Sequence, residues 1–430
     1  MTAAIGPAHW LDSVEELDRS RWAALVRTAD LEYHLDYLAF LEAEDPDGRS
    51  ILVLRDGVGH YVAGCALSQL TDQTPRSSRA IDLIAHPTTL RLDDDDTSMP
   101  DAIVAVLRQH TGDAPTDLEP GLRDAWQALN RTVGVPLVVR SMWDSSLLVS
   151  PELNGRERHR AMAALLTALL REALRRGYLS VALLYVRRGD PGLERLLTAA
   201  GFVSGSVRGI SRIRLAGCSS VEDYLRRFRR KRRTGMRREA ERAAEVILLD
   251  HDDTEVRNRV AELERLNSDY YGLQLTAGRL RAVHEHLAAT VPDRVRQYGI
   301  VNDGSIVAAH LVLRGDRKLY ALAYGADYAR LGHANGLYGP LVFQRPVAEA
   351  VAAGMSAVEL GPEGYEPKML RGARLDQLRT YLWSATPEGR ALARDWLAVV
   401  DARTTVALDS LMRRHSVCDS TLADEMVVTS

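Results

Sequence analysis

Residues 297–313 read QYGIVNDGSIVAAHLVL, and this stretch decides the fold class because a turn signal separates two apolar runs. The dipeptide Asp303-Gly304 favours a tight turn between two paired β-strands. A second stretch of the same kind, SILVLRDGVGHYVAGCALSQL at residues 50–70, carries Asp56-Gly57 between its apolar runs. The sequence therefore predicts one β-hairpin in each half of the chain.

The segments that follow the two hairpins have the same order, which indicates two related halves. After the first hairpin we expect a strand, a loop, a long helix, a second strand and a short helix, with the strands at 145–150 and 178–186 and the end at Gly201-Phe202. After the second hairpin the matching features are strands at 318–326 and 356–361, a helix between them, and a segment that reaches Gly372-Ala373. Between the halves, residues 216–290 are mostly helical by pattern.

A basic stretch, RRFRRKRRTGMRRE at residues 226–239, lies at this junction, although the formal net charge of the chain is only −3. We expect Ser219 or Ser220 to cap the helix that contains it and Thr234-Gly235 to interrupt that helix. On one continuous helix, residues 226–233 place cations on every side. Either this is surface charge, or part of it faces an anionic ligand or protein group.

The composition is that of a folded enzyme, with 46% hydrophobic and 26% charged residues in 430. The N-terminal sequence lacks the features of a signal peptide, and no apolar run is long enough to span a membrane. Three cysteines far apart in sequence make a disulfide framework improbable. We therefore expect a cytoplasmic protein that does not associate with membranes.

Metal and nucleotide motifs are weak or missing. His284 and His286 lie two residues apart, whereas helical zinc motifs place histidines four residues apart, so we expect both to face solvent and predict no metal site. The sequence contains no G-x-S-x-G, P-loop or G-x-G-x-x-G motif, which leaves serine hydrolases, P-loop enzymes and Rossmann enzymes without their usual signal.

The piece REALRRGYLSVALLYVRRGDPGLERLLTAAGFV at residues 171–203 resembles the second half of a GNAT acyltransferase domain. With its second copy, the basic junction and the ending LGPEGYEPKMLRGARLDQL at 360–378, the chain resembles a tandem GNAT protein of the Fem-like group over roughly residues 45–385. The resemblance implies an α+β fold with two GNAT-like domains, each a central mixed sheet flanked by helices. We expect the domains at 1–215 and 216–430, with the basic junction 221–246 opening the second.

The resemblance also implies acyl or aminoacyl transfer to an amine, from a pantetheine thioester or an aminoacyl-tRNA. In that fold two central strands splay apart, and a helix N-terminus beside them can bind a pyrophosphate. The family's loop before this helix reads R/Q-x-x-G-x-G/A. Here His159 replaces the first glycine after Arg156, and the glycines after Arg330 have a different spacing, so a donor held on a carrier protein or a tRNA stays open.

The two halves differ at the position that the family uses for its acid. In ordinary GNAT enzymes a tyrosine four residues before the terminal Gly-Phe protonates the leaving thiolate; here Leu197 takes that place in the first half and Lys368 in the second. A lysine can donate a proton or stabilise negative charge on a leaving group. We therefore expect the chemistry in the second half and predict the catalytic residues Lys368, Glu363 and Tyr365. The predicted donor-binding residues are Arg330, Gly332, His333, Asn335, Gly336, Arg232, Arg233, Arg237, Arg371 and Arg374.

Three functions remain open at this stage. The first is an N-acyltransferase that uses acyl-CoA or a phosphopantetheinyl carrier protein as co-substrate, without a permanently bound cofactor, and acts on a small-molecule or peptide amine. The second is an aminoacyl-tRNA-dependent, amide-forming transferase of the Fem-like group. The third is a non-catalytic tandem domain that binds nucleic acid or a partner protein through residues 226–238. Since the overall charge is not basic, the sequence favours the thioester donor.

Overall fold

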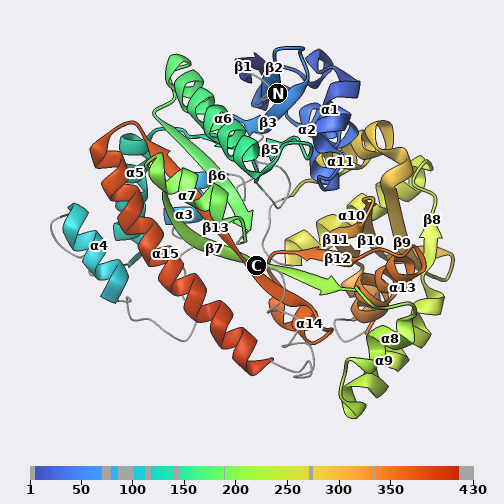
Figure 1. Cartoon of the computed structure of the whole chain (residues 1–430). Coiled ribbons are helices and arrows are strands. Elements are labelled where there is room, and N and C mark those ends of the chain that lie inside the picture. The colour runs from blue at the N-terminus through green and yellow to red at the C-terminus, as the bar shows by residue number, and fades with distance from the viewer. Residues whose placement is uncertain are drawn as a thin grey trace. The chain divides into compact units, whose positions relative to one another are not determined.

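The computed structural model describes residues 5–69, 79–85, 101–111, 118–139, 145–187, 189–270, 275–332 and 336–415 (Figure 1). The chain divides into two compact units, which we call unit 1 (Met1–Gly209 with Asp376–Leu408) and unit 2 (Ile210–Leu375 with Asp409–Ser430). These units differ from the expected division after residue 215, because residues 376–408 join unit 1. The division into two GNAT-like domains at that position stays a prediction.

Unit 1 is built on a mixed sheet with the strand order β1-β2-β3-β4-β6-β13-β7, and β5 pairs with β3. Its strands are β1 (Ile5–Leu11), β2 (Arg49–Asp56), β3 (Tyr61–Ser68), β4 (Leu137–Val139), β5 (Leu148–Val149), β6 (Ser180–Arg187) and parts of β7 (Val203–Arg214) and β13 (Arg374–Ser384). Its helices are α1 (Arg19–Val26), α2 (Leu35–Glu44), α3 (Ala80–Ala85), α4 (Asp101–Thr111), α5 (Leu118–Val133), α6 (Gly155–Arg175), α7 (Pro191–Ala199) and most of α15 (Pro387–Arg414). Single 3₁₀ turns occupy Val14–Glu16, Leu31–Tyr33 and Pro46–Gly48.

The alternation of side chains in β2 shows how the sheet of unit 1 is covered. Leu52 and Leu54 belong to the core cluster with α6, whereas Ile51 and Val53 belong to the cluster with α1 and α2. Successive residues of a strand point to opposite faces, so a strand covered on both faces reads as one continuous apolar run. This explains the uninterrupted run ILVL in the sequence.

Unit 2 has the strand order β7-β12-β11-β10-β9-β8. Its own strands are β8 (Ile247–Leu249), β9 (Val295–Asn302), β10 (Ser305–Arg314), β11 (Lys318–Ala326) and β12 (Ala357–Gly361). Its helices are α8 (Val221–Arg226), α9 (Arg230–Arg242), α10 (Thr254–Tyr270), α11 (Ala277–Thr290), α12 (Tyr328–Leu331), the π-helix η7 (Gly339–Gln344), α13 (Arg345–Ala352) and α14 (Tyr365–Met369), with 3₁₀ turns at Ala243–Glu245 and Pro292–Arg294. The mixed α/β class with sheets flanked by helices is confirmed.

Both predicted hairpins are present. β9 and β10 pair antiparallel around Asp303-Gly304, whose positive φ values of 49° and 73° suit the tight turn that joins twisted strands. β2 and β3 also pair antiparallel, and the Asp56 carboxylate stabilises the loop between them by accepting from the backbone N–H of Val58 and His60. The strands predicted after each hairpin are found as β5, β6, β11 and β12.

The expected helix break at Thr234-Gly235 is wrong. α9 runs through both residues, while the break falls between the end of α8 and Arg230. A glycine inside a helix costs only about 1 kcal/mol relative to alanine. Burial of Met236 on the inner side of α9 offsets that cost, and Ser220 caps α8 as expected.

Candidate active site

The central feature of unit 2 is an opening between two parallel strands. β11 and β12 pair over only three positions, from Lys318 opposite Ala357 to Tyr320 opposite Glu359. Both strands continue further, but the described residues show no pairing between them beyond this point. We call the diverging ends, residues 321–326 and 360–361, the wedge. Because every second residue of a strand directs its N–H and C=O to the same edge, the wedge side of β11 can offer backbone groups to a ligand.

Lys368 lies beside the end of β12 and is buried, with 7% of its surface exposed. Its Nζ donates to three backbone carbonyl oxygens, those of Leu360 (2.7 Å), Gly361 (3.2 Å) and Pro362 (3.0 Å). An ammonium group has three N–H bonds, so all of them are engaged. Burial lowers the pKa of Lys368 to about 8, against the opposing effect of nearby carboxylates.

The other two predicted catalytic residues stand next to Lys368 in the chain and in space. Glu363 is exposed and has a positive φ of 62°, which is rare for a residue other than glycine, and its charge acts on the Lys368 ammonium. Tyr365 is half-buried and begins α14. Gly361 and Gly364 also have positive φ values, so the segment that links β12 to α14 is a tight, left-handed turn around Lys368.

Arg371, predicted to bind the donor, is engaged by protein groups. Its guanidinium donates to both carboxylate oxygens of Glu239 on α9, at 2.9 and 2.7 Å, and to the backbone oxygen of Pro367 at 3.0 Å. It also lies 4.7 Å from the centre of the Phe343 ring. Arg374 is half-buried at the start of β13 and forms no ion pair within the described ranges.

The arginines predicted to bind the donor on the basic helix also have protein partners. Arg232 donates to the backbone oxygen of Leu370, and Arg233 donates to that of Phe228 at 2.9 Å. Arg237 forms an ion pair with Glu222 at 2.5 Å. Arg232 and Arg233 are thus half-buried and bonded to backbone carbonyls, whereas Arg237 is exposed and pairs with a carboxylate, so all three have partners within the protein.

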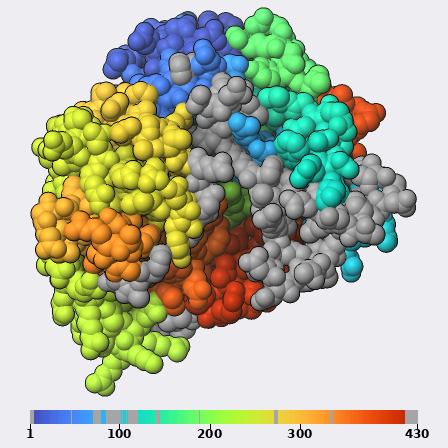
Figure 2. All heavy atoms as spheres, turned by 180° about the vertical axis from the view of Figure 1, so that it is seen from behind, coloured from blue at the N-terminus to red at the C-terminus, as the bar shows by residue number. Residues whose placement is uncertain are grey.

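A different set of cationic side chains in the region of α8 and α9 is exposed to solvent. Arg229, Arg230, Lys231 and Arg238 are exposed, and their side chains have no ion-pair partner among the residues that the structure describes. Three of them lie on the outward side of α9, opposite the inward side that contains Met236 and Glu239. Figure 2 shows the surface of this yellow-green segment.

The loop before the second-half helix is only partly described. Arg330 is exposed in α12, and Gly332 ends that helix with a φ of 68°. His333 and Asn335 lie outside the described residues. Gly336 also has a φ of 68°, and its carbonyl oxygen accepts from Arg242 at 3.1 Å.

The helix that follows begins with a π-helical turn, which sequence reasoning missed. A Cβ on Gly339, its first residue, would lie 2.6 Å from the carboxyl carbon of Glu239. Glu239 therefore contacts both Arg371 and the start of this helix. Single π-helical turns occur often at functional sites, but the sequence offers no clear signal for them.

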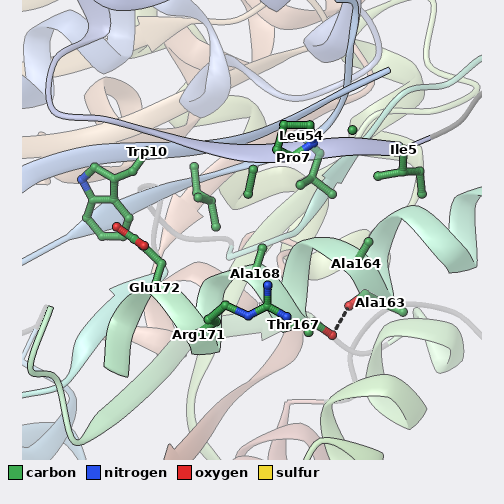
Figure 3. A pocket seen from close by; sticks show the side chains of 13 residues that line it. Ile5, Pro7, Trp10, Leu54, Ala163, Ala164, Thr167, Ala168, Arg171 and Glu172 are labelled. Carbon is green, nitrogen blue, oxygen red and sulfur yellow. Dashed lines mark hydrogen bonds between the residues drawn. The ribbon is translucent and has the colours of Figure 1, made fainter. Parts of the chain in front are cut away.

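Unit 1 has a groove of about 700 Å³ between β1 and α6, shown in Figure 3. Leu52 and Leu54 form its floor and alanines of α6 line its wall. Hydrogen bonds from Arg175 and Arg176 hold the pKa of Glu172, at one end, at about 2, so this carboxylate stays ionised near neutral pH and is only a weak base. Leu197, the counterpart of Lys368, is fully buried in the core of unit 1.

The expectation that His284 faces solvent is wrong. Its ring is buried between the Glu264 carboxylate, 3.1 Å from Nε2, and the Gln297 amide, 2.9 Å from Nδ1. The spacing of the histidines could not predict this burial, because the groups that surround His284 come from other elements, α10 and β9. In the part of the chain that the structure describes, no group of three or more acidic, histidine or cysteine side chains could hold a metal ion. None of the described helices has the length and apolarity to cross a membrane.

Comparisons with known proteins give a matching family and similar solved structures. The sequence model of the FemAB-like family, described as peptidoglycan biosynthesis/recognition, matches residues 145–416. The crystal structure of FemX is similar with a TM-score of 0.55 and 10% identity, over 90% of this chain and 100% of that chain. A tandem GNAT protein from the clavulanic acid biosynthesis pathway gives a TM-score of 0.47 and 15% identity, over 89% of this chain and 99% of that one. No curated protein matches this chain.

Proposed function

The chain belongs to the FemAB-like family, and on this premise we propose that it is a transferase that joins an acyl group to an amine as an amide. The observation that carries the proposal is the wedge between β11 and β12, with a buried lysine held beside its end. Backbone N–H groups at such an opening can bind an extended donor and the oxyanion of a tetrahedral intermediate. We also propose that the protein acts in the cytoplasm.

In the proposed reaction, the acceptor nitrogen attacks the carbonyl carbon of the donor, and the bond from that carbon to sulfur or oxygen then breaks. The nitrogen loses a proton to a base, for which Glu363 is the candidate. The leaving thiolate or ribose oxygen gains a proton from an acid, for which Lys368 is the candidate. Tyr365 would hydrogen-bond the reacting group. Since all three N–H bonds of Lys368 point to carbonyl oxygens, one of them must turn to the leaving group.

For the donor we propose a pantetheine thioester, supplied as acyl-CoA or on a phosphopantetheinyl carrier protein. A narrow pantetheine arm suits an opening edged by backbone groups. Gly336, whose carbonyl oxygen accepts from the Arg242 guanidinium, lies just before the helix that follows, so this cation is a candidate phosphate contact. The acceptor would be an amine of a small molecule or peptide, and the family description makes the peptides of peptidoglycan precursors the first to try.

Aminoacyl-tRNA is the second candidate donor, and the open cations of α9 favour it. Arg230, Lys231 and Arg238 are exposed on one side of the helix without ion-pair partners in the described part of the chain. Clustered cations of this kind bind phosphates along a nucleic acid backbone.

A donor panel tests these alternatives. The protein is incubated with labelled acetyl-CoA, a labelled acyl carrier protein and tRNA charged with labelled amino acids, each with amines that include peptidoglycan precursor peptides. Label that enters a hydroxylamine-stable product supports amide formation and identifies the donor. If no donor gives such a product while RNA binds with a steep salt dependence, the non-catalytic binding hypothesis replaces this proposal.

Substitution of the lysine tests the site. Lys368→Met removes the proton and the charge, so we expect kcat to fall by roughly 10²–10⁴ while donor affinity changes little. Lys318→Met, which removes another lysine of unit 2 at the start of β11, should leave kcat unchanged. Leu197→Ala should reduce stability only. A near-normal kcat for Lys368→Met would place the chemistry elsewhere.

A further inference from the structure

Helices α8 and α9, which belong to the basic junction, contact the segment 367–371 at several points. The Tyr224 hydroxyl on α8 donates to the backbone oxygen of Arg371 at 2.7 Å, and Arg232 on α9 donates to that of Leu370. Arg371 in turn forms its two-pronged ion pair with Glu239, which is 132 residues away in the sequence. A two-pronged pair fixes orientation as well as distance.

The segment held in this way is the one that contains Lys368. Arg371 also donates to the Pro367 carbonyl, so the same guanidinium contacts both α9 and the helix of the lysine. The Lys368 ammonium in turn donates a hydrogen bond to the backbone oxygen of Leu360, near the end of β12. Hydrogen bonds, together with the backbone that joins Pro367 to Lys368, therefore connect α9 to the edge of the wedge.

The opposite side of α9 is open. Arg238 is exposed, whereas its neighbour Glu239 is turned inward to Arg371. A phosphate group bound at Arg230, Lys231 or Arg238 would thus be attached to the same short helix that holds the lysine segment. Both candidate donors contain phosphates, as a diphosphate in CoA and as a backbone in RNA.

We propose that Glu239 and Arg371 are positioning residues, which fix Lys368 to α9 so that a phosphate-bearing ligand on the outward side of that helix is held in register with the lysine. The proposal rests on the proposed function only in taking Lys368 as part of the site. Neither residue needs to touch the reacting atoms.

Three lysines in the whole chain, Lys231, Lys318 and Lys368, make the proposal directly measurable. Lysine labelled with ¹³C gives three side-chain signals by NMR, which Lys231→Arg and Lys318→Arg assign. Titration then reports the pKa of Lys368 without any turnover, so this result is independent of whether the protein forms amides.

Two substitutions break the pair in different ways. Gly339→Ala changes no charge but puts a methyl group where the Glu239 carboxylate lies, so that the carboxylate must move. Arg371→Lys keeps the charge and loses the two-pronged geometry. In both variants we expect water to reach Lys368 more easily and its pKa to rise by about one unit toward its ordinary value.

Arg259→Gln is the matched control. It breaks another ion pair of unit 2, with Asp327 at 3.1 Å, whose side chains are about as buried as those of Arg371 and Glu239. It should lower stability and leave the Lys368 titration unchanged. An unchanged Lys368 titration in folded Gly339→Ala and Arg371→Lys protein would overturn the proposal.

A ligand titration tests the connection to α9. Inorganic tripolyphosphate should shift the Lys231 signal by contact and the Lys368 signal through the pair, and Gly339→Ala should abolish only the second shift. Separate titrations with CoA and with a short RNA hairpin show which phosphate source binds. If no probe shifts Lys231, or if Lys231 shifts while Lys368 of the unaltered protein does not, α9 does not act on the lysine as proposed.

Discussion

Lys368 is a residue whose charge is unfavourable where it lies, and this has a measurable effect on stability. Its pKa of about 8 in the folded protein is below the ordinary value of 10.5, because burial penalises the ammonium form. Between these two pH values the unfolded chain binds more protons than the folded one, so the free energy of unfolding rises with pH. Below pH 8 the lysine is protonated in both states, so the full cost of burying the ammonium lowers the free energy of unfolding.

The prediction for Lys368 compares the pH dependence of stability in the unaltered protein and in Lys368→Met. From pH 8 to pH 10, the stability of the unaltered protein should increase relative to that of Lys368→Met, because the methionine cannot titrate. Urea unfolding of both proteins at several pH values measures this difference, and other titrating groups cancel in the comparison. A difference that does not change with pH would mean that the ammonium is not penalised by burial.

Glu363 can be tested through its backbone as well as its carboxylate. A left-handed φ of 62° costs roughly 1 kcal/mol for a residue with a Cβ and nothing for glycine. Glu363→Gly should therefore leave stability equal or higher, as measured by the melting temperature, and lower kcat if the carboxylate is the base. If activity survives with the more stable protein, the base is another group.

The elements show which parts of the fold could be read from the sequence. Asp-Gly turns and apolar runs are local signals, so both hairpins and the strands β5, β6, β11 and β12 were predicted correctly. The position four residues before Gly372 also identified Lys368, which is buried beside the end of β12. The carbonyl partners of the basic arginines could not be predicted, because the pattern treated α8 and α9 as one helix and those partners depend on where the chain folds back.

Two glycines give the prediction at the scale of elements. Gly235 lies inside α9 with no atom near its missing Cβ, so Gly235→Ala should stabilise the protein by about 0.5–1 kcal/mol. Gly325 lies where α10 packs on β11, and a Cβ there would be 2.3 Å from the Leu263 carbonyl carbon. Gly325→Ala should destabilise by several times as much, since backbone must move. Chemical denaturation of both variants checks the contrast, and equal effects would contradict this packing.

At the scale of the whole molecule, the tandem GNAT-type fold of the Fem-like group is confirmed. The sequence pattern placed every segment after residue 216 in the second half, because it follows order along the chain. Core formation follows contacts instead: β13 pairs with β6 from Leu378 to Ser384, and Trp396 on α15 is fully buried. This is why the compact units differ from the expected boundary.

The whole-molecule prediction concerns a fragment. Residues 1–215 alone should lack a cooperative unfolding transition, because β6 loses β13, its antiparallel partner, and the side chains under α15 lose their cover. Attaching residues 376–415 to the fragment through a flexible linker should restore the transition. Circular dichroism during thermal unfolding compares the two, and a cooperative transition in the shorter fragment would contradict the division into units.

The division of unit 1 between the two ends of the sequence also sets an order of events at the ribosome. All of residues 210–375 must be synthesised before the strand and helix that complete unit 1 emerge. The N-terminal segment therefore waits, with the edge of β6 exposed, while unit 2 already has nearly all of its chain. A nascent chain of this protein is expected to need protection from aggregation in its first half until β13 and α15 have been synthesised.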